Sequence, residues 1–240
     1  HAREWYKWDH AYYNGKYYVY FGIVPVLVLY LPCYLITGVH LHNFMAIFIF
    51  SLLFLAGLLG TVHEILQKWF PKTSLGVWFL LMELILTGSG ILYMTKRPDL
   101  YTVPILSGLA FGLLGLWCFL RGIRENGVSL KYLAAGSLLT ALVAGCRPQL
   151  LMLLLPVFFI LWKHLLPVRN KLPAVLAFCV PMLFIAAALM YYNYSRFGSV
   201  FDFGANYNLT MNDMRRRGFQ LDRIPTGVIA YLLQTVRLAL

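Results

Sequence analysis

The sequence predicts an all-α fold, a polytopic transmembrane helix bundle with about six crossing helices. Of the 240 residues, 60% are hydrophobic and 12% are charged, whereas a soluble domain carries roughly 25% charged residues. The charges cluster between long stretches that hold none, as expected for helices in a bilayer. Many of the 16 Tyr, 17 Phe and 6 Trp stand where apolar stretches end, as in the aromatic belts of membrane interfaces.

The candidate helices are the apolar runs 22–38, 43–62, 75–95, 103–121, 131–146, 149–163 and 173–192. The first run contains Pro25 and Pro32, which remove helical hydrogen bonds, so we expect a juxtamembrane or half-inserted helix there. The other runs are the predicted crossings. We expect a single transmembrane domain over 1–240, formed by an external loop with the juxtamembrane helix (1–42), the bundle (43–192), and an external loop with the start of a further helix (193–240).

The adjacent runs 131–146 and 149–163 are short for a membrane crossing. Such helices extend only about 22–24 Å at 1.5 Å per residue. The turn between them, Arg147-Pro148, must therefore lie below the outer membrane surface. Irregular backbone at that depth is tolerated only where it is buried in protein or lines a wet cavity. The sequence thus predicts an outward-facing polar cavity with Arg147 at its floor.

Basic residues predict the orientation of the bundle. The formal net charge is +11, and the loops 63–74, 122–131 and 163–172 are rich in Lys and Arg. With about six crossings these loops share one side, which the positive-inside rule makes the cytoplasm. We interpret the positive charge as contact with anionic lipid and expect no nucleic-acid partner. Residues 1–21 and 193–226 are predicted to lie together on the opposite side.

The cysteines all fall within or beside apolar runs: Cys33, Cys118, Cys146 and Cys179. No pair has metal-ligand spacing, so we interpret them as packing residues and expect neither a metal nor another cofactor. The chain begins at His1 without an initiator Met and ends inside the apolar run 227–240. We therefore expect a piece of a longer protein.

Polar and aromatic residues gather in the segments predicted to lie on the outer side. They comprise Asp9, Lys16 and Tyr20 in the first loop, Lys96, Arg97 and Asp99 in the second, Arg147, and finally Arg196 and Asp202. Aromatic rings stack on sugars, carboxylates accept hydroxyl protons, and Arg binds phosphate through two parallel hydrogen bonds. This combination is more than a solvated surface requires.

Three of these segments resemble, in order, the external motifs of bacterial GT-C-type membrane glycosyltransferases. They are 9–38 with "NGKYYVYFG", 96–108 reading "KRPDLYTVPILSG", and 193–210 reading "NYSRFGSVFDFGANYNLT". The resemblance implies a GT-C-like enzyme of the bacterial plasma membrane. Such an enzyme transfers a sugar from a polyprenyl-phosphate carrier to an acceptor (a glycan, lipid or protein) on the extracytoplasmic face. The family's first transmembrane helix is missing here, so the catalytic base is either Asp9 or a residue upstream of His1.

Each assigned residue has a simpler alternative. Asp9 and Asp99 are the candidate general bases, but Asp9 also suits a turn and Asp99 a helix N-cap. Lys16, Tyr20, Lys96, Arg97, Arg147, Arg196 and Asp202 are the candidate substrate-binding residues. Glu83, the carboxylate we place deepest in a span, is expected to be protonated and hydrogen-bonded between helices.

Two other functions share these features. A transporter or flippase for a lipid-linked saccharide would need the cavity and its Arg residues but no base. A non-catalytic membrane subunit would need neither. Internal repeats, which favour transport, are not visible in the sequence.

Overall fold

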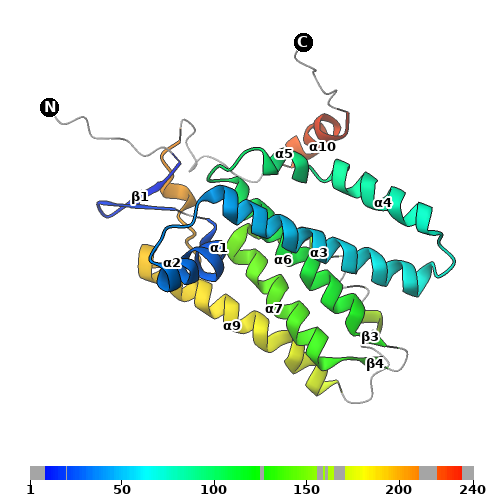
Figure 1. Ribbon diagram of the computed structural model, residues 1–240. Coiled ribbons are helices and arrows are strands. Elements are labelled where there is room, and N and C mark those ends of the chain that lie inside the picture. The colour runs from blue at the N-terminus through cyan, green and yellow to red at the C-terminus, as the bar shows by residue number, and fades with distance from the viewer. Residues whose placement is uncertain are drawn as a thin grey trace, which may run out of the picture. The chain divides into compact units, whose positions relative to one another are not determined.

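The computed structural model describes residues 9–19, 21–124, 127–155, 159, 162–164, 171–210 and 221–233. Its contacts divide the chain into two units, His1–Tyr20 with Gly204–Leu240, and Phe21–Phe203. The second unit holds the helix bundle (Figure 1). The fold is mostly helical, as predicted, and its strands are short.

Three helices in the described part of the chain are long and apolar enough to cross a membrane: α3 (Asn43–Trp69), α6 (Thr102–Gly122) and α9 (Leu172–Phe197). Shorter apolar helices cover Ile23–Thr37, Leu75–Gly88 (α4) and Leu130–Cys146 (α7). The membrane character predicted from the sequence is therefore supported. Six crossings remain a prediction, since three of the expected crossings have the required length here.

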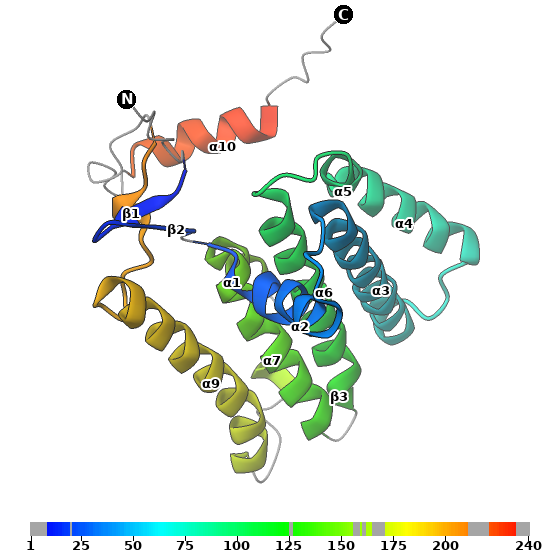
Figure 2. The same cartoon turned by 60° about the vertical axis from the view of Figure 1, so that its left-hand side comes forward.

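Consecutive helices of the bundle pack side by side in the order α3, α6, α7, α9 (Figure 2). Glycines allow two of these pairs to approach closely. A Cβ on Gly57 of α3 would lie 2.8 Å from the Leu114 backbone nitrogen of α6, and one on Gly136 of α7 would lie 2.5 Å from the Phe119 ring. Small residues at helix crossings are typical of membrane bundles, where dispersion rather than hydrophobic burial drives association.

The run predicted as one helix over 75–95 is divided into α4 and α5 (Ile91–Thr95). The break falls at Gly88-Ser89-Gly90, where Gly90 has a φ of 72°. Glycine adopts this left-handed conformation without steric cost, so it ends the helix. α4 itself spans only 14 residues.

The run 22–38 is helical from Ile23 to Thr37, as α1 (Ile23–Pro25), the π-helical turn η1 (Val26–Tyr30) and α2 (Leu31–Thr37). Pro25 and Pro32 redistribute the backbone hydrogen bonds without ending the segment. The run 149–163 begins as the 3-10 helix η2 (Pro148–Leu154). Most of its remainder lies outside the described residues.

Two hydrogen bonds from Lys68, which also forms an ion pair within α3, join the ends of α3 and α6. The Lys68 ammonium donates to the carbonyls of Leu120 and Ile123 and lies 3.5 Å from Glu64. Arg124 stands in the adjoining hairpin of β3 (Ile123–Arg124) and β4 (Gly127–Val128). Lys68 and Arg124 therefore lie at one end of the bundle, as predicted.

The unit formed by both ends of the chain contains an antiparallel hairpin, β1 (Ala11–Tyr13) and β2 (Lys16–Tyr18). Its turn is Asn14-Gly15, with φ of 48° and 76°, the conformation that Asn-Gly hairpin turns favour. Ala11 bridges to Asn208, which follows η3 (Ala205–Tyr207). The first and last predicted external loops thus meet. The helix α10 (Arg223–Leu233) follows.

Candidate functional site

Arg147 stacks on two aromatic rings at the end of α7. Its guanidinium carbon lies 4.3 Å from the ring centre of Phe21 and 5.7 Å from that of Tyr101. The two rings stack on each other with centres 5.3 Å apart. We call these three residues the Arg147 cage. Stacking fixes the plane of the guanidinium and therefore the direction of its donors.

Three segments of the backbone position the residues of the cage. α7 ends at Cys146, Arg147 itself is extended, and Pro148 begins η2. Gly22 has a φ of 73°, and a Cβ there would lie 2.6 Å from Pro104 of α6, so glycine lets Phe21 approach the start of that helix. The cage residues thus come from three separate segments. Only the folded chain can bring them together.

The cage has a positive charge and no carboxylate partner in the part of the chain that the structure describes. Among the described residues, the Arg147 Nε is buried without a hydrogen-bond acceptor. The ion pair found in that part of the chain joins Lys68 to Glu64 instead. The structure therefore does not support a role for Arg147 as the ion-pair partner of a carboxylate such as Glu83 or Asp99. A half-buried guanidinium with an unsatisfied donor is a suitable site for an anion.

Asp99 holds the start of α6. Its Oδ1 accepts hydrogen bonds from the backbone N–H groups of Tyr101 (3.0 Å) and Thr102 (2.8 Å), and from the Thr102 hydroxyl (2.8 Å). Partial burial raises the pKa of Asp99, but these hydrogen bonds and the charge of Arg97 outweigh it and lower the pKa. These contacts support the capping alternative, and a lower pKa makes a weaker base. Catalysis by Asp99 stays a prediction.

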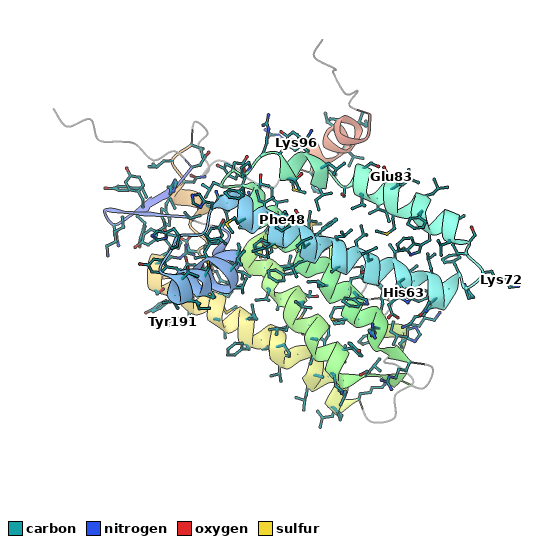
Figure 3. The ribbon with its side chains drawn as sticks, viewed as in Figure 1. Phe48, His63, Lys72, Glu83, Lys96 and Tyr191 are labelled. Atoms are coloured by element: carbon teal, nitrogen blue, oxygen red, sulfur yellow. The ribbon has the colours of Figure 1, made fainter. Side chains whose placement is uncertain are left out.

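Lys96 and Arg97 are exposed in the connection between α5 and α6 (Figure 3). The Arg97 guanidinium lies 5.0 Å from the ring centre of Tyr93. The Pro98 carbonyl, in the same connection, accepts a hydrogen bond from Asn43 at the start of α3 (3.4 Å). This connection therefore lies at the end of the bundle that holds Tyr101.

Arg196 is bound within its own helix. Its Nη2 donates to the Asn193 side chain (3.0 Å), and its guanidinium stacks over Tyr192 at 3.7 Å. Asn193 is 2% exposed and donates to the Val200 carbonyl (3.3 Å), which ties down the chain after α9. These contacts indicate a structural role for Arg196. Asp202 lies half-buried three residues after Ser199, whose carbonyl accepts its backbone N–H (3.4 Å).

The remaining predicted site residues lie in the unit formed by the chain ends. Asp9 is half-buried, has a φ of 57°, and donates its backbone N–H to Leu209 (3.1 Å). Asp tolerates this left-handed conformation better than most residues, as the turn alternative requires. Lys16 is exposed on β2. Tyr20 lies outside the described residues.

The prediction for Glu83 is wrong in this structure. Its side chain is exposed and points away from α3 (Figure 3), and no described residue hydrogen-bonds to it. The buried carboxylate is Glu64, 8% exposed, whose pairing with Lys68 was not foreseen. The i, i+4 spacing of Glu64 and Lys68 was the available signal. Phe21 and Tyr101 were also missed, because aromatic residues at predicted membrane interfaces are too common to stand out.

Comparison of the chain with protein-family models, curated proteins and solved structures finds no match.

Proposed function

We propose that this chain acts in a membrane glycosyltransferase that takes a sugar from a polyprenyl-phosphate-linked donor and transfers it on the extracytoplasmic face. The observation that carries the proposal is the Arg147 cage, a guanidinium held by two rings and lacking a carboxylate partner among the described residues. The turn that bears it follows an apolar helix. An anionic group attached to a membrane lipid could reach such a position.

The reaction requires charge stabilisation at one oxygen. The acceptor hydroxyl attacks the anomeric carbon, the bond from that carbon to the phosphate oxygen breaks, and the lipid phosphate leaves with the electron pair. Arg147 would bind the developing negative charge, an interaction stronger in the transition state than in the ground state. The hydroxyl proton passes to a carboxylate base, for which the resemblance offers Asp9 or a residue upstream of His1. Lys96 and Arg97 would attract the donor to this end of the bundle.

A transfer assay on the purified full chain tests the proposal. We expect sugar to pass from a short-chain polyprenyl-phosphate sugar to an added acceptor, and the transfer to fall in Arg147→Ala. Arg121 offers a matched control, because its guanidinium also lies over two rings, at 5.8 Å from Trp117 and 5.5 Å from Tyr132. Arg121→Ala should keep the activity. Movement of an intact labelled donor across proteoliposomes without transfer would instead indicate a flippase and overturn the proposal.

A further inference from the structure

A cleft of about 690 Å³ opens between the end of α3 and the start of α4, above the loop that joins them. The residues that line it include His63, Gln67, Leu75, Trp78 and Phe79. This cleft adjoins the end of α3 that carries Lys68, and the Arg147 cage lies elsewhere, after α7. It therefore plays no part in the transfer proposed above.

The two walls of the cleft differ in chemistry. α4 contributes Leu75, Trp78 and Phe79, which are apolar. α3 contributes His63 and Gln67, which are one helical turn apart on one face. Among the described residues, neither of these two side chains has a hydrogen-bond partner. A ligand that hydrogen-bonds to the polar wall and packs against the apolar wall must itself be amphiphilic, with one polar end and one apolar end.

The charge around the cleft indicates the sign of the polar end. Among the described residues no carboxylate lines it, and Lys72 stands exposed in the connecting loop between the lining residues Pro71 and Thr73 (Figure 3). The nearby Glu64 is paired with Lys68. This end of the bundle is the one predicted to face the cytoplasm, where bilayers present anionic headgroups. The available charge is positive and suits a phosphate.

We propose that this cleft binds one anionic glycerophospholipid. An acyl chain lies along Leu75, Trp78 and Phe79. The phosphate accepts hydrogen bonds from His63 and Gln67 and is attracted by the positive charge of Lys72. A transmembrane helix, from this chain or a second copy, fits less well, because its apolar surface would leave His63 and Gln67 unsatisfied.

Native mass spectrometry of the full chain, released from detergent, tests this binding. We expect saturable retention of one phosphatidylglycerol and about tenfold weaker retention of phosphatidylcholine with the same acyl chains. Lys72→Ala should weaken phosphatidylglycerol binding about fivefold. Gln67→Trp, which fills the cleft from an exposed helix position, should abolish it. Lys131→Ala removes an exposed cation at the start of α7, outside the lining of the cleft, and should leave binding unchanged.

Equal retention of the two lipids, or unchanged retention in Gln67→Trp, would overturn the proposal. So would a dimer that Gln67→Trp dissociates, since the occupant would then be a second copy. The melting temperature of each variant shows whether it is folded. Lys72→Ala, which changes only an exposed loop residue, keeps the test decisive if Gln67→Trp fails to fold. Because no sugar substrate is used, failure of the transfer assay leaves this result unaffected.

Discussion

At the scale of single residues, the Arg147 cage offers a positive charge that attracts an anion and aromatic rings that orient the guanidinium. A guanidinium over an aromatic ring gains roughly 0.5–2 kcal/mol, depending on how far it is removed from water. Two rings, Phe21 and Tyr101, share this contact. The two rings stack on each other, and the guanidinium lies nearer to Phe21 than to Tyr101. A phosphate with two oxygens in one plane matches the edge of a guanidinium, which the compact ammonium of lysine does not offer.

The first prediction concerns that difference. Arg147→Lys should lower donor turnover partially, because the charge stays and the planar fork is lost. Arg147→Ala should raise the activation free energy of transfer by about 2–4 kcal/mol, the usual effect of removing a hydrogen-bond donor that stabilises the transition state. Steady-state transfer rates on detergent-purified, monodisperse variants measure both. Wild-type turnover in a folded Arg147→Ala protein would exclude the phosphate-binding role.

The second prediction separates the two roles of Asp99. As a cap, Asp99→Ala should destabilise the folded protein by roughly 0.5–2 kcal/mol, whereas Asp99→Asn keeps an acceptor oxygen and should cost less. The pKa of Asp99 is lowered in the folded protein, so its contribution is present above the ordinary Asp pKa and disappears as the pH falls through the lowered value. Thermal melts of both variants between neutral pH and pH 3 should show the difference from wild type shrink.

The activity of the Asp99→Asn variant tests the second role of Asp99, that of the general base. If Asp99 only caps α6, Asp99→Asn should keep near-normal sugar transfer. Loss of transfer in a stable Asp99→Asn protein would identify Asp99 as the base and contradict the capping interpretation.

At the scale of elements, glycine sets how closely helices approach. The third prediction is that Gly57→Ala destabilises the bundle by roughly 1–3 kcal/mol, because its Cβ would meet the α6 backbone at 2.8 Å and backbone cannot move as a side chain can. Gly112→Ala is the control, since a Cβ there would lie 3.9 Å from Val143, an ordinary contact. Chemical unfolding in mixed micelles compares the two. Equal stabilities would show that the α3–α6 contact is not close-packed.

At the scale of the whole molecule, the fourth prediction concerns sidedness. The hairpin at 11–18 pairs with residue 208, so cysteines placed at the exposed Asn14 and Asn206 should label from the same, outer side. Lys68 binds the end of α6, so cysteines at Lys72 and Arg124 should label together from the cytoplasmic side. A membrane-impermeant maleimide on intact cells measures this, with the four native cysteines replaced. Labelling of Asn14 and Arg124 from one side would refute the orientation.

The sequence by itself determined the helical membrane character of this protein, because charge-free runs of apolar residues report directly on the surrounding solvent. It also located most helix positions and the end of α7 at Arg147-Pro148, since proline and charge interrupt a helix locally. Helix ends were less predictable. α3 continues to Trp69, past Glu64 and Lys68, because these two charges pair with each other and Lys68 also donates to carbonyls at the end of α6.

Only the tertiary structure decided which residues meet. Phe21, Tyr101 and Arg147 are distant in the sequence, and their stacking depends on how α6 and α7 pack and on the backbone turn at Gly22. The burial of Glu64 and the exposure of Glu83 were likewise set by which helix faces a neighbour. A linear pattern records how apolar each segment is, but every side of such helices is apolar. The choice of partner face therefore comes from side-chain shape and close packing, which exist only in the folded molecule.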